Sequence, residues 1–196
     1  YHYTRSDSPK ETIHYSLLAA REAEINNAEW EAFDHYKNAV RFLEKLEDYP
    51  ERDKLLLEIY EKAAVFNSAA WIDAITCLDW LQKAIDHYKA EQNTDKVFSL
   101  SLSYIVASSI SSNYSAARKI LPEIIENCKV EEGTLTWAIL FGAGVCLNDW
   151  YEGYQQDLFS HAQTSIDIFE SQLDKMPEGA WGPYSWALFW REKARA

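Results

Sequence analysis

The chain has 196 residues, of which 47% are hydrophobic and 14% aromatic, and its formal net charge is −12. This apolar content excludes intrinsic disorder, and the excess of acidic residues excludes a protein built to bind nucleic acid, whose affinity depends mostly on Lys and Arg. Six glycines and five prolines are too few for a turn-rich all-β fold. The length suits one domain or one elongated array.

Apolar residues recur at intervals of three and four residues, which is the spacing of amphipathic helices. The first predicted helix has Ser8 as its N-cap and Pro9 as its first residue, and Glu11 is placed to complete a capping box. It ends at Asn26 and Asn27, because Asn tolerates left-handed backbone better than most residues. A second helix follows, so the pattern predicts a helix hairpin over residues 8–48.

The hairpin pattern recurs three more times along the chain. The predicted hairpins span residues 51–92, 95–128 and 134–174, with turns at 67–68, 112–113 and 148–149. A linker rich in Pro and Gly follows at 177–183, and a further, truncated helix starts at 184–196. The sequence therefore predicts an all-α array of about four antiparallel helix hairpins over residues 1–176.

The second helices of these hairpins carry a stripe of small and aromatic residues. In the first hairpin the stripe is Ala32, Tyr36 and Ala39, which share one helix face because residues three and four apart are neighbours. In the third hairpin Ala117 follows Tyr114 at the same interval. This pattern resembles the tetratricopeptide repeat, and the resemblance implies a right-handed superhelical stack in which each hairpin covers its neighbour.

The fourth hairpin carries the resemblance further, with Phe141 and Gly142 at the Leu–Gly position and Tyr151 at the aromatic position. The lengthened, irregular units are similar to the degenerate arrays that follow the ATPase core in AAA/STAND-type regulators and cyclase-associated ATPases. This likeness implies a protein-interaction or regulatory segment of a larger cytoplasmic signalling protein, without catalytic activity of its own. The missing initiator Met and an end inside a predicted helix also indicate a fragment.

Stacked helix hairpins create a concave face lined by the first helix of each hairpin, which predicts a partner-binding groove. The candidate lining residues are Tyr15, Glu22, Tyr60, Glu61, Tyr104, Ser108 and Trp137. The two glutamates favour a basic or neutral partner. A second candidate interface is the aromatic cluster at the C-terminal end, because an exposed aromatic patch marks a contact surface. This cluster comprises Trp181, Tyr184, Trp186, Phe189 and Trp190.

No motif predicts a catalytic, cofactor or metal site. Glu11 and His14 have the spacing of half a di-iron site, but the sequence holds no second copy of that motif. Gly142 and Gly144 lie inside a predicted helix with no strand before them, so we interpret them as small residues that allow close helix packing.

Three widely spaced cysteines predict free thiols in a reducing cytoplasm, with Cys77 and Cys146 in the core and Cys128 more exposed. The uncharged stretch 97–117 is rich in serine, which indicates a helix packed closely among other helices rather than a membrane span. We therefore expect no membrane or nucleic-acid partner.

Two alternatives to a partner-binding function remain open. A receptor for a peptide or small ligand predicts a closed, aromatic-lined pocket with a few convergent polar groups. An all-α enzyme predicts a deep cleft with paired carboxylates whose pKa values are perturbed. The preferred partner is a protein or peptide, including another domain of the same polypeptide.

Overall fold

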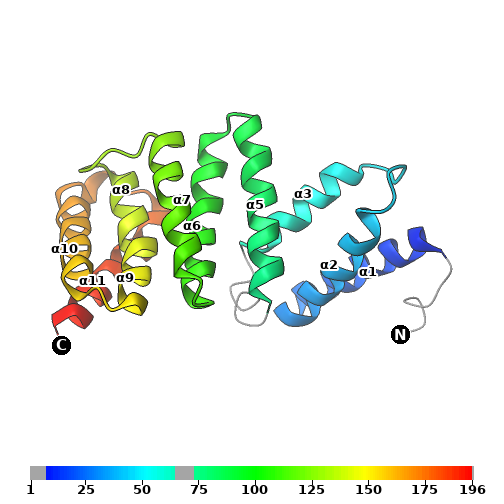
Figure 1. The fold of residues 1–196 in the computed structure, drawn as a ribbon, viewed down its shortest axis with the longest axis horizontal. Coiled ribbons are helices and arrows are strands. Elements are labelled where there is room, and N and C mark those ends of the chain that lie inside the picture. The colour runs from blue at the N-terminus through cyan, green and yellow to red at the C-terminus, as the bar shows by residue number, and fades with distance from the viewer. Residues whose placement is uncertain (1–7, 65–72, 196) are drawn as a thin grey trace. The chain divides into compact units, whose positions relative to one another are not determined.

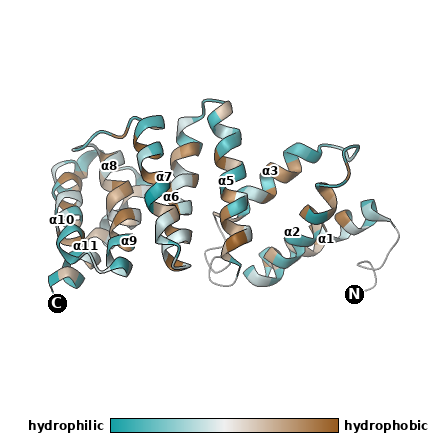
Figure 2. Ribbon diagram, in the orientation of Figure 1, coloured by the Kyte–Doolittle hydropathy of each residue, from teal (hydrophilic) through white to brown (hydrophobic). Residues whose placement is uncertain are grey.

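The computed structural model describes residues 8–64 and 73–195 of the chain (Figure 1). These residues form helices and connecting turns, without any strand, which confirms the all-α prediction. Figure 2 shows hydrophobic and hydrophilic residues interspersed along the helices, as expected where one face of each is buried. Within the described residues, none of the helices combines the length and the apolar character that crossing a membrane requires.

The chain divides into two compact units, Tyr1–Ala84 and Ile85–Ala196, here called unit 1 and unit 2. The division falls inside one helix, α5 (Ala74–Ala90). The predicted turn at residues 67–68 lies outside the described residues. Unit 1 contains α1 (Pro9–Ile25), α2 (Glu29–Leu43), α3 (Arg52–Lys62) and α5 as far as residue 84.

The core of unit 1 is built on the predicted stripe of α2. Ala32, Tyr36 and Ala39 are all buried, because α1 and α2 pack against each other as a hairpin. Phe33 is 1% exposed, and its ring centroid lies 5.0 Å from that of Trp80 on α5. The stripe therefore marks the buried face of this helix, as the sequence predicted.

Helix α2 ends at Leu43, five residues before its predicted end at 48. Arg52 at the start of α3 reaches back to this end of α2. Its Nε donates to the carbonyl of Leu43 at 2.8 Å, and its second terminal nitrogen donates to that of Glu44 at 3.4 Å. The Leu43 carbonyl also accepts from the amide of Leu46 at 3.3 Å, so Arg52 adds a side-chain partner at this helix C-terminus. At the start of α1, Ser8 is the N-cap as predicted, but its side chain makes no capping hydrogen bond.

Unit 2 continues the hairpin pattern. Its helices are α6 (Thr94–Ile110), α7 (Tyr114–Asn127), α8 (Leu135–Ile139), the π-helix η2 (Leu140–Val145), α9 (Cys146–Glu152), α10 (Gln155–Ser171), the 3₁₀ turns η3 (Leu173–Lys175) and η4 (Glu178–Ala180), and α11 (Trp181–Arg195). Helices α6 and α7 pack side by side, as do α10 and α11 (Figure 1). Cys146, Leu158, Ala162 and Trp190 form one buried cluster of the core.

The predicted turn of the fourth hairpin at Asn148 and Asp149 is wrong. The helical chain continues through both residues to Glu152 and turns at Gly153, whose φ is +81°. Asn148 and Asp149 are buried within α9 and hydrogen-bonded through their side chains. Glycine takes left-handed backbone without steric penalty, so the turn forms there. Tyr151 consequently lies in the last turn of the first helix of this hairpin.

Five helix ends in the described chain share one turn geometry. In each, the first or second residue after the helix has a positive φ, and two backbone hydrogen bonds close the end as in a Schellman motif. After α6, for example, the amide of Asn113 donates to the carbonyl of Ser108 at 2.7 Å, and that of Ser112 donates to Ser109 at 3.1 Å. The positive-φ residues are Asn27, Gln92, Ser112, Lys129 and Gly153.

Gly142 and Gly144 allow close helix packing, as predicted. A Cβ at Gly142 would lie 3.2 Å from the carbonyl oxygen of Pro183 on α11. A Cβ at Gly144 would lie 3.0 Å from Leu102 on α6. Three serines of α6, Ser101, Ser108 and Ser109, are buried, in agreement with close packing of this helix.

The last helix begins at Trp181, three residues before its predicted start at 184. The Pro/Gly-rich segment 177–183 is therefore only partly a linker, because it contains the turn η4 and the first residues of α11. Pro183 is compatible with this position, since the first turn of a helix needs no backbone donor there.

Candidate functional site

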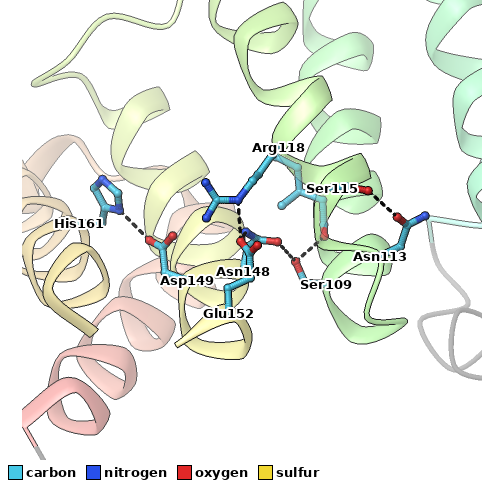
Figure 3. Close-up of polar contacts among 9 residues, drawn as sticks. Ser109, Asn113, Ser115, Arg118, Asn148, Asp149, Glu152 and His161 are labelled. Atoms are coloured by element: carbon cyan, nitrogen blue, oxygen red, sulfur yellow. Dashed lines mark hydrogen bonds and ion pairs between the residues drawn. The ribbon is translucent and has the colours of Figure 1, made fainter. Parts of the chain in front are cut away.

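A buried carboxylate lies in the middle of unit 2. Asp149 on α9 is 6% exposed, and it is the only buried Asp, Glu, Lys, Arg or His side chain among the described residues. Its Oδ2 is hydrogen-bonded to Nδ1 of His161 on α10, at 2.7 Å. Figure 3 shows the two side chains pointing toward each other from neighbouring helices. Burial of a carboxylate costs free energy unless it is paired, so this position requires a structural or functional explanation.

Asp149 faces a pocket of about 250 Å³ within unit 2. The pocket lies among α6, α7, η2, α9 and α10, and it has an apolar and a polar part. Its apolar side chains are Ile105, Ala117, Leu121, Phe141 and Val145. Its polar side chains are Arg118, Asn148, Asp149, Asp157 and His161.

Arg118 is held at the edge of this pocket by α9. Its Nε donates to Oε2 of Glu152 at 2.7 Å, and its guanidinium lies 4.7 Å from the ring centroid of Tyr154. The hydrogen bond to Glu152 raises the pKa of Arg118 above its usual value. The positive charge of Arg118 is thus already neutralised by a partner within the protein.

Asn148 extends the same polar network toward α6. Its Nδ2 donates to Oε2 of Glu152 at 2.6 Å, and its Oδ1 accepts a hydrogen bond from Ser109 at 3.4 Å (Figure 3). Both ends of this buried amide therefore have protein partners. Its role is to hold Glu152 against Arg118 and to fix α9 beside α6.

The π-helix η2 supplies part of the pocket wall. Phe141 and Val145 lie in this segment, and π-helical turns inside α-helices occur frequently at functional sites. The rings of Trp137 and Phe141 stack with their centroids 4.0 Å apart. The ring centroids of His161 and Phe141 lie 4.9 Å apart in an edge-to-face arrangement, so aromatic contacts hold the histidine beside Asp149.

The sequence did not identify this site. Asp149 falls in the predicted turn at 148–149, and no motif in the sequence connects it with His161. One signal is present in the sequence: Asp149 directly follows the uncharged run 133–148, whose apolar residues favour a buried helix. The contact between Asp149 and His161 depends on how α10 packs against α9, which residue spacing does not determine.

The seven predicted groove residues do not gather at this pocket, and none of them lines it. Tyr60, Ser108 and Trp137 are buried, so their side chains belong to the cores of the two units rather than to an open surface. Tyr15 and Glu22 are exposed on α1. Glu61 and Tyr104 are half-buried on α3 and α6, respectively.

The predicted C-terminal aromatic interface is only partly exposed. Trp181 and Trp186 are about half exposed, at 50% and 51%. Tyr184 is half-buried, and its hydroxyl donates to Glu170 at 3.2 Å. Trp190 was expected in the exposed set, but it is 4% exposed because it packs into the core cluster of unit 2.

A second hollow, of about 630 Å³, lies between α2 and α5 of unit 1. Lys83 on α5 lies 3.0 Å from Glu44 and 2.9 Å from Asp79, and Lys37 is paired with Asp73. Four basic and three acidic side chains line this groove, so it does not share the acidity of the chain as a whole. The described residues contain no cluster of His, Cys, Asp and Glu arranged to hold a metal ion.

The cysteines lie where the sequence placed them. Cys77 and Cys146 are buried, and Cys128 is half-buried. Burial raises the pKa of the Cys77 thiol to about 11 and raises that of Cys146 still further. Thiols with such raised pKa values are poor nucleophiles at neutral pH, so they serve as small apolar residues.

Comparison with known proteins gives no relative to which this chain can be assigned. No family model matches the chain, and no curated protein matches it. Function is therefore inferred from the geometry of the two units alone.

Proposed function

We propose that this chain is a non-catalytic protein-interaction and regulatory segment, built as a tetratricopeptide-like, right-handed stack of helix hairpins. In this proposal it belongs to a larger cytoplasmic signalling ATPase or transcriptional regulator. Support comes from the repeated helix hairpins, their common turn geometry and the buried stripe of α2.

The observation that carries the proposal is an exposed aromatic surface on α9 and α11, here called the C-terminal aromatic face. It consists of Trp150, Trp186 and Phe189, which surround the buried Trp190 with ring centroids 4.8 to 5.9 Å from its ring. The three outer side chains are 37%, 51% and 44% exposed. Exposed aromatic side chains in one contiguous cluster mark interaction surfaces and are enriched in their centres.

The charges of α11 indicate the chemistry of the partner. This helix carries Arg191, Lys193 and Arg195 against the single acid Glu192, in a chain whose net charge is −12. Lys193 lies 5.4 Å from the ring centroid of Phe189 at the edge of the aromatic face. We therefore assign the face to an amphipathic helix with an apolar stripe and acidic flanks, in a partner protein or another domain of the same polypeptide.

The test is a titration of the full chain with designed helical peptides, followed by fluorescence anisotropy. One peptide carries Leu at positions i, i+3, i+4 and i+7 with Glu on its flanks, and its counterpart carries Lys instead of Glu. We expect the Glu-flanked peptide to bind and the Lys-flanked peptide to bind more weakly. The double variant Trp186→Ala, Phe189→Ala should weaken binding by about tenfold or more, equivalent to ~1.4 kcal/mol.

A matched control removes exposed apolar side chains elsewhere. Leu18 and Ile25 on α1 are 47% and 81% exposed, so the double variant Leu18→Ala, Ile25→Ala should leave peptide binding unchanged. The assignment of the face is wrong if wild-type protein binds neither peptide. It is also wrong if the α1 variant loses as much affinity as the α11 variant.

A further inference from the structure

We infer that the pocket of unit 2 is a binding site for a small organic ammonium ion that carries a compact apolar group. This site goes beyond the proposed function, because none of the residues of the C-terminal aromatic face lines the pocket. The inference depends on the excess of carboxylates over permanent cations in the lining, on the volume of the pocket and on its apolar wall.

The balance of charge in the pocket favours a cation. Two carboxylates line it, those of Asp149 and Asp157, against one permanently charged cation, Arg118. Arg118 is paired with Glu152 outside the lining. Asp157 forms no ion pair within the described part of the chain, and it lies in the first turn of α10. Asp157 is exposed to water, so a bound cation would add an ion pair at the mouth of the pocket rather than relieve a buried charge.

Asp149 offers a preformed acceptor for such a cation. Its Oδ2 is held by His161, which fixes the orientation of the carboxylate inside the pocket. Because the carboxylate is 6% exposed, an ammonium group beside it would be shielded from water, which strengthens the ionic hydrogen bond. Both the oxygen and the nitrogen of the Asn148 amide already have protein partners, so we expect Asn148 to line the pocket without binding the ammonium group.

The apolar part of the pocket fixes the size of the ligand. Five apolar side chains from α6, α7 and η2 contribute to the lining, and the volume is about 250 Å³. Pockets for drug-sized ligands occupy about 300–1,000 Å³, so this one suits a smaller molecule. A short branched alkylammonium ion would place its nitrogen at the Asp149 carboxylate and its alkyl group against this wall, with Asp157 adding a second negative charge in the lining.

A metal ion does not fit the same donors. Asp149, Asp157 and His161 are the potential ligands in the pocket, but they are not grouped closely enough to coordinate one ion. An organic cation needs only one carboxylate beside its nitrogen, and its alkyl group can contact the apolar wall. The two halves of the pocket therefore point to one ligand with a charged and an apolar end.

The experiment titrates the full chain with 3-methylbutylamine and follows the indole N–H signal of Trp137 and the backbone amide of Asp149 by NMR. Trp137 stacks on Phe141 in the pocket wall, so its signal reports occupancy. The neutral 3-methylbutan-1-ol and the anionic 3-methylbutanoate have the same alkyl group. We expect saturable shifts with the amine in the millimolar range and none with the other two compounds.

Variants that each remove one carboxylate test which negative charges bind the amine. Asp157 is exposed, so Asp157→Asn should leave the fold intact while weakening amine binding by about tenfold. Asp149→Asn should abolish binding, and its thermal unfolding shows whether any loss comes from misfolding. Asp174 on η3 is an exposed carboxylate outside the pocket, so Asp174→Asn removes the same charge and should bind the amine like wild type.

Three results would overturn the inference. Equal shifts with the alcohol would show a merely apolar cavity. Equal weakening in the Asp157 and Asp174 variants would show a general charge effect. Absence of any shift at tens of millimolar amine would show that the pocket does not bind this class of ligand. Each result is independent of peptide binding at the C-terminal aromatic face.

Discussion

Three glycines of unit 2 differ in what a side chain would meet at their positions. At Gly142 a Cβ would crowd the backbone oxygen of Pro183 at 3.2 Å, although the backbone conformation is ordinary. At Gly153 a Cβ would meet no atom within 4 Å, but φ is +81°. At Gly182 neither restriction applies. These positions separate the effect of space from the effect of backbone conformation.

The loss of stability on alanine substitution at the three glycines should follow these restrictions. Gly142→Ala should destabilise by about 1–3 kcal/mol, since overpacking against backbone cannot relax easily. Gly153→Ala should destabilise by about 1–2 kcal/mol through left-handed strain alone. Gly182→Ala should be neutral or stabilising by up to about 1 kcal/mol, because alanine favours helix. Urea unfolding measures all three, and a loss at Gly182 as large as at Gly142 would contradict this account.

At the scale of elements, side-chain contacts attach α5 to the rest of unit 1. Lys37 on α2 pairs with Asp73, just before α5, and Lys83 on α5 pairs with Glu44, just after α2. Burial raises the pKa of Glu44, but hydrogen bonds from Lys83 and Tyr60 outweigh it, so the pKa is lowered. The pKa of Asp73 is lowered in the same way, because hydrogen bonds from Lys37 and Thr76 outweigh burial.

These lowered pKa values give the ion pairs a defined pH dependence. A carboxylate whose pKa is lower in the folded state stabilises the fold above its unfolded pKa, near 4, and loses this contribution as the pH falls through the folded value. The double variant Glu44→Gln, Asp73→Asn should be less stable than wild type at pH 7 by about 1 kcal/mol, since the pairs are partly exposed. This difference should shrink as the pH falls through the lowered folded-state pKa values of the two carboxylates.

Glu47 provides a control for this pH dependence. It is exposed and forms no ion pair within the described residues, so Glu47→Gln should follow the wild-type stability curve at every pH. Chemical denaturation at a series of pH values from 7 downward, as far as the wild type stays folded, measures each curve. A constant gap between wild type and the double variant would contradict the role of these ion pairs.

At the scale of the whole molecule, the chain forms two compact units that share α5. Each unit has its own large buried side chains, such as Phe33 in unit 1 and Phe169 in unit 2, which are 1% and 0% exposed. Regions with separate cores can open separately, and hydrogen exchange measures such opening. The division therefore predicts distinct stabilities along the chain.

Two core truncations test this division. Phe33→Ala and Phe169→Ala should each destabilise by about 3–5 kcal/mol, because each leaves a cavity. In hydrogen-exchange mass spectrometry, Phe33→Ala should reduce the protection of backbone amides in α1 to α3. Phe169→Ala should reduce that protection in α10 and α11. Loss of protection over the whole chain in either variant would show that the two units unfold as one.

The sequence by itself determined the helical content and much of the helix pattern. The three- and four-residue spacing, together with turns such as Asn26–Asn27, placed α1, α6 and α7 close to their observed bounds, because these signals act within a few residues. The buried stripe of α2 and the packing role of Gly142 were also predicted, since both follow from residue size on one helix face.

Only the tertiary structure decided which residues form the candidate site. Arg52, nine residues after Leu43, donates a hydrogen bond to the end of α2, and the burial of Trp190 depends on the packing of α11 against the core of unit 2. Asp149 meets His161 only because α9 continues to Gly153 and α10 then folds back beside it. Such contacts depend on helix packing, whereas periodicity describes each helix alone.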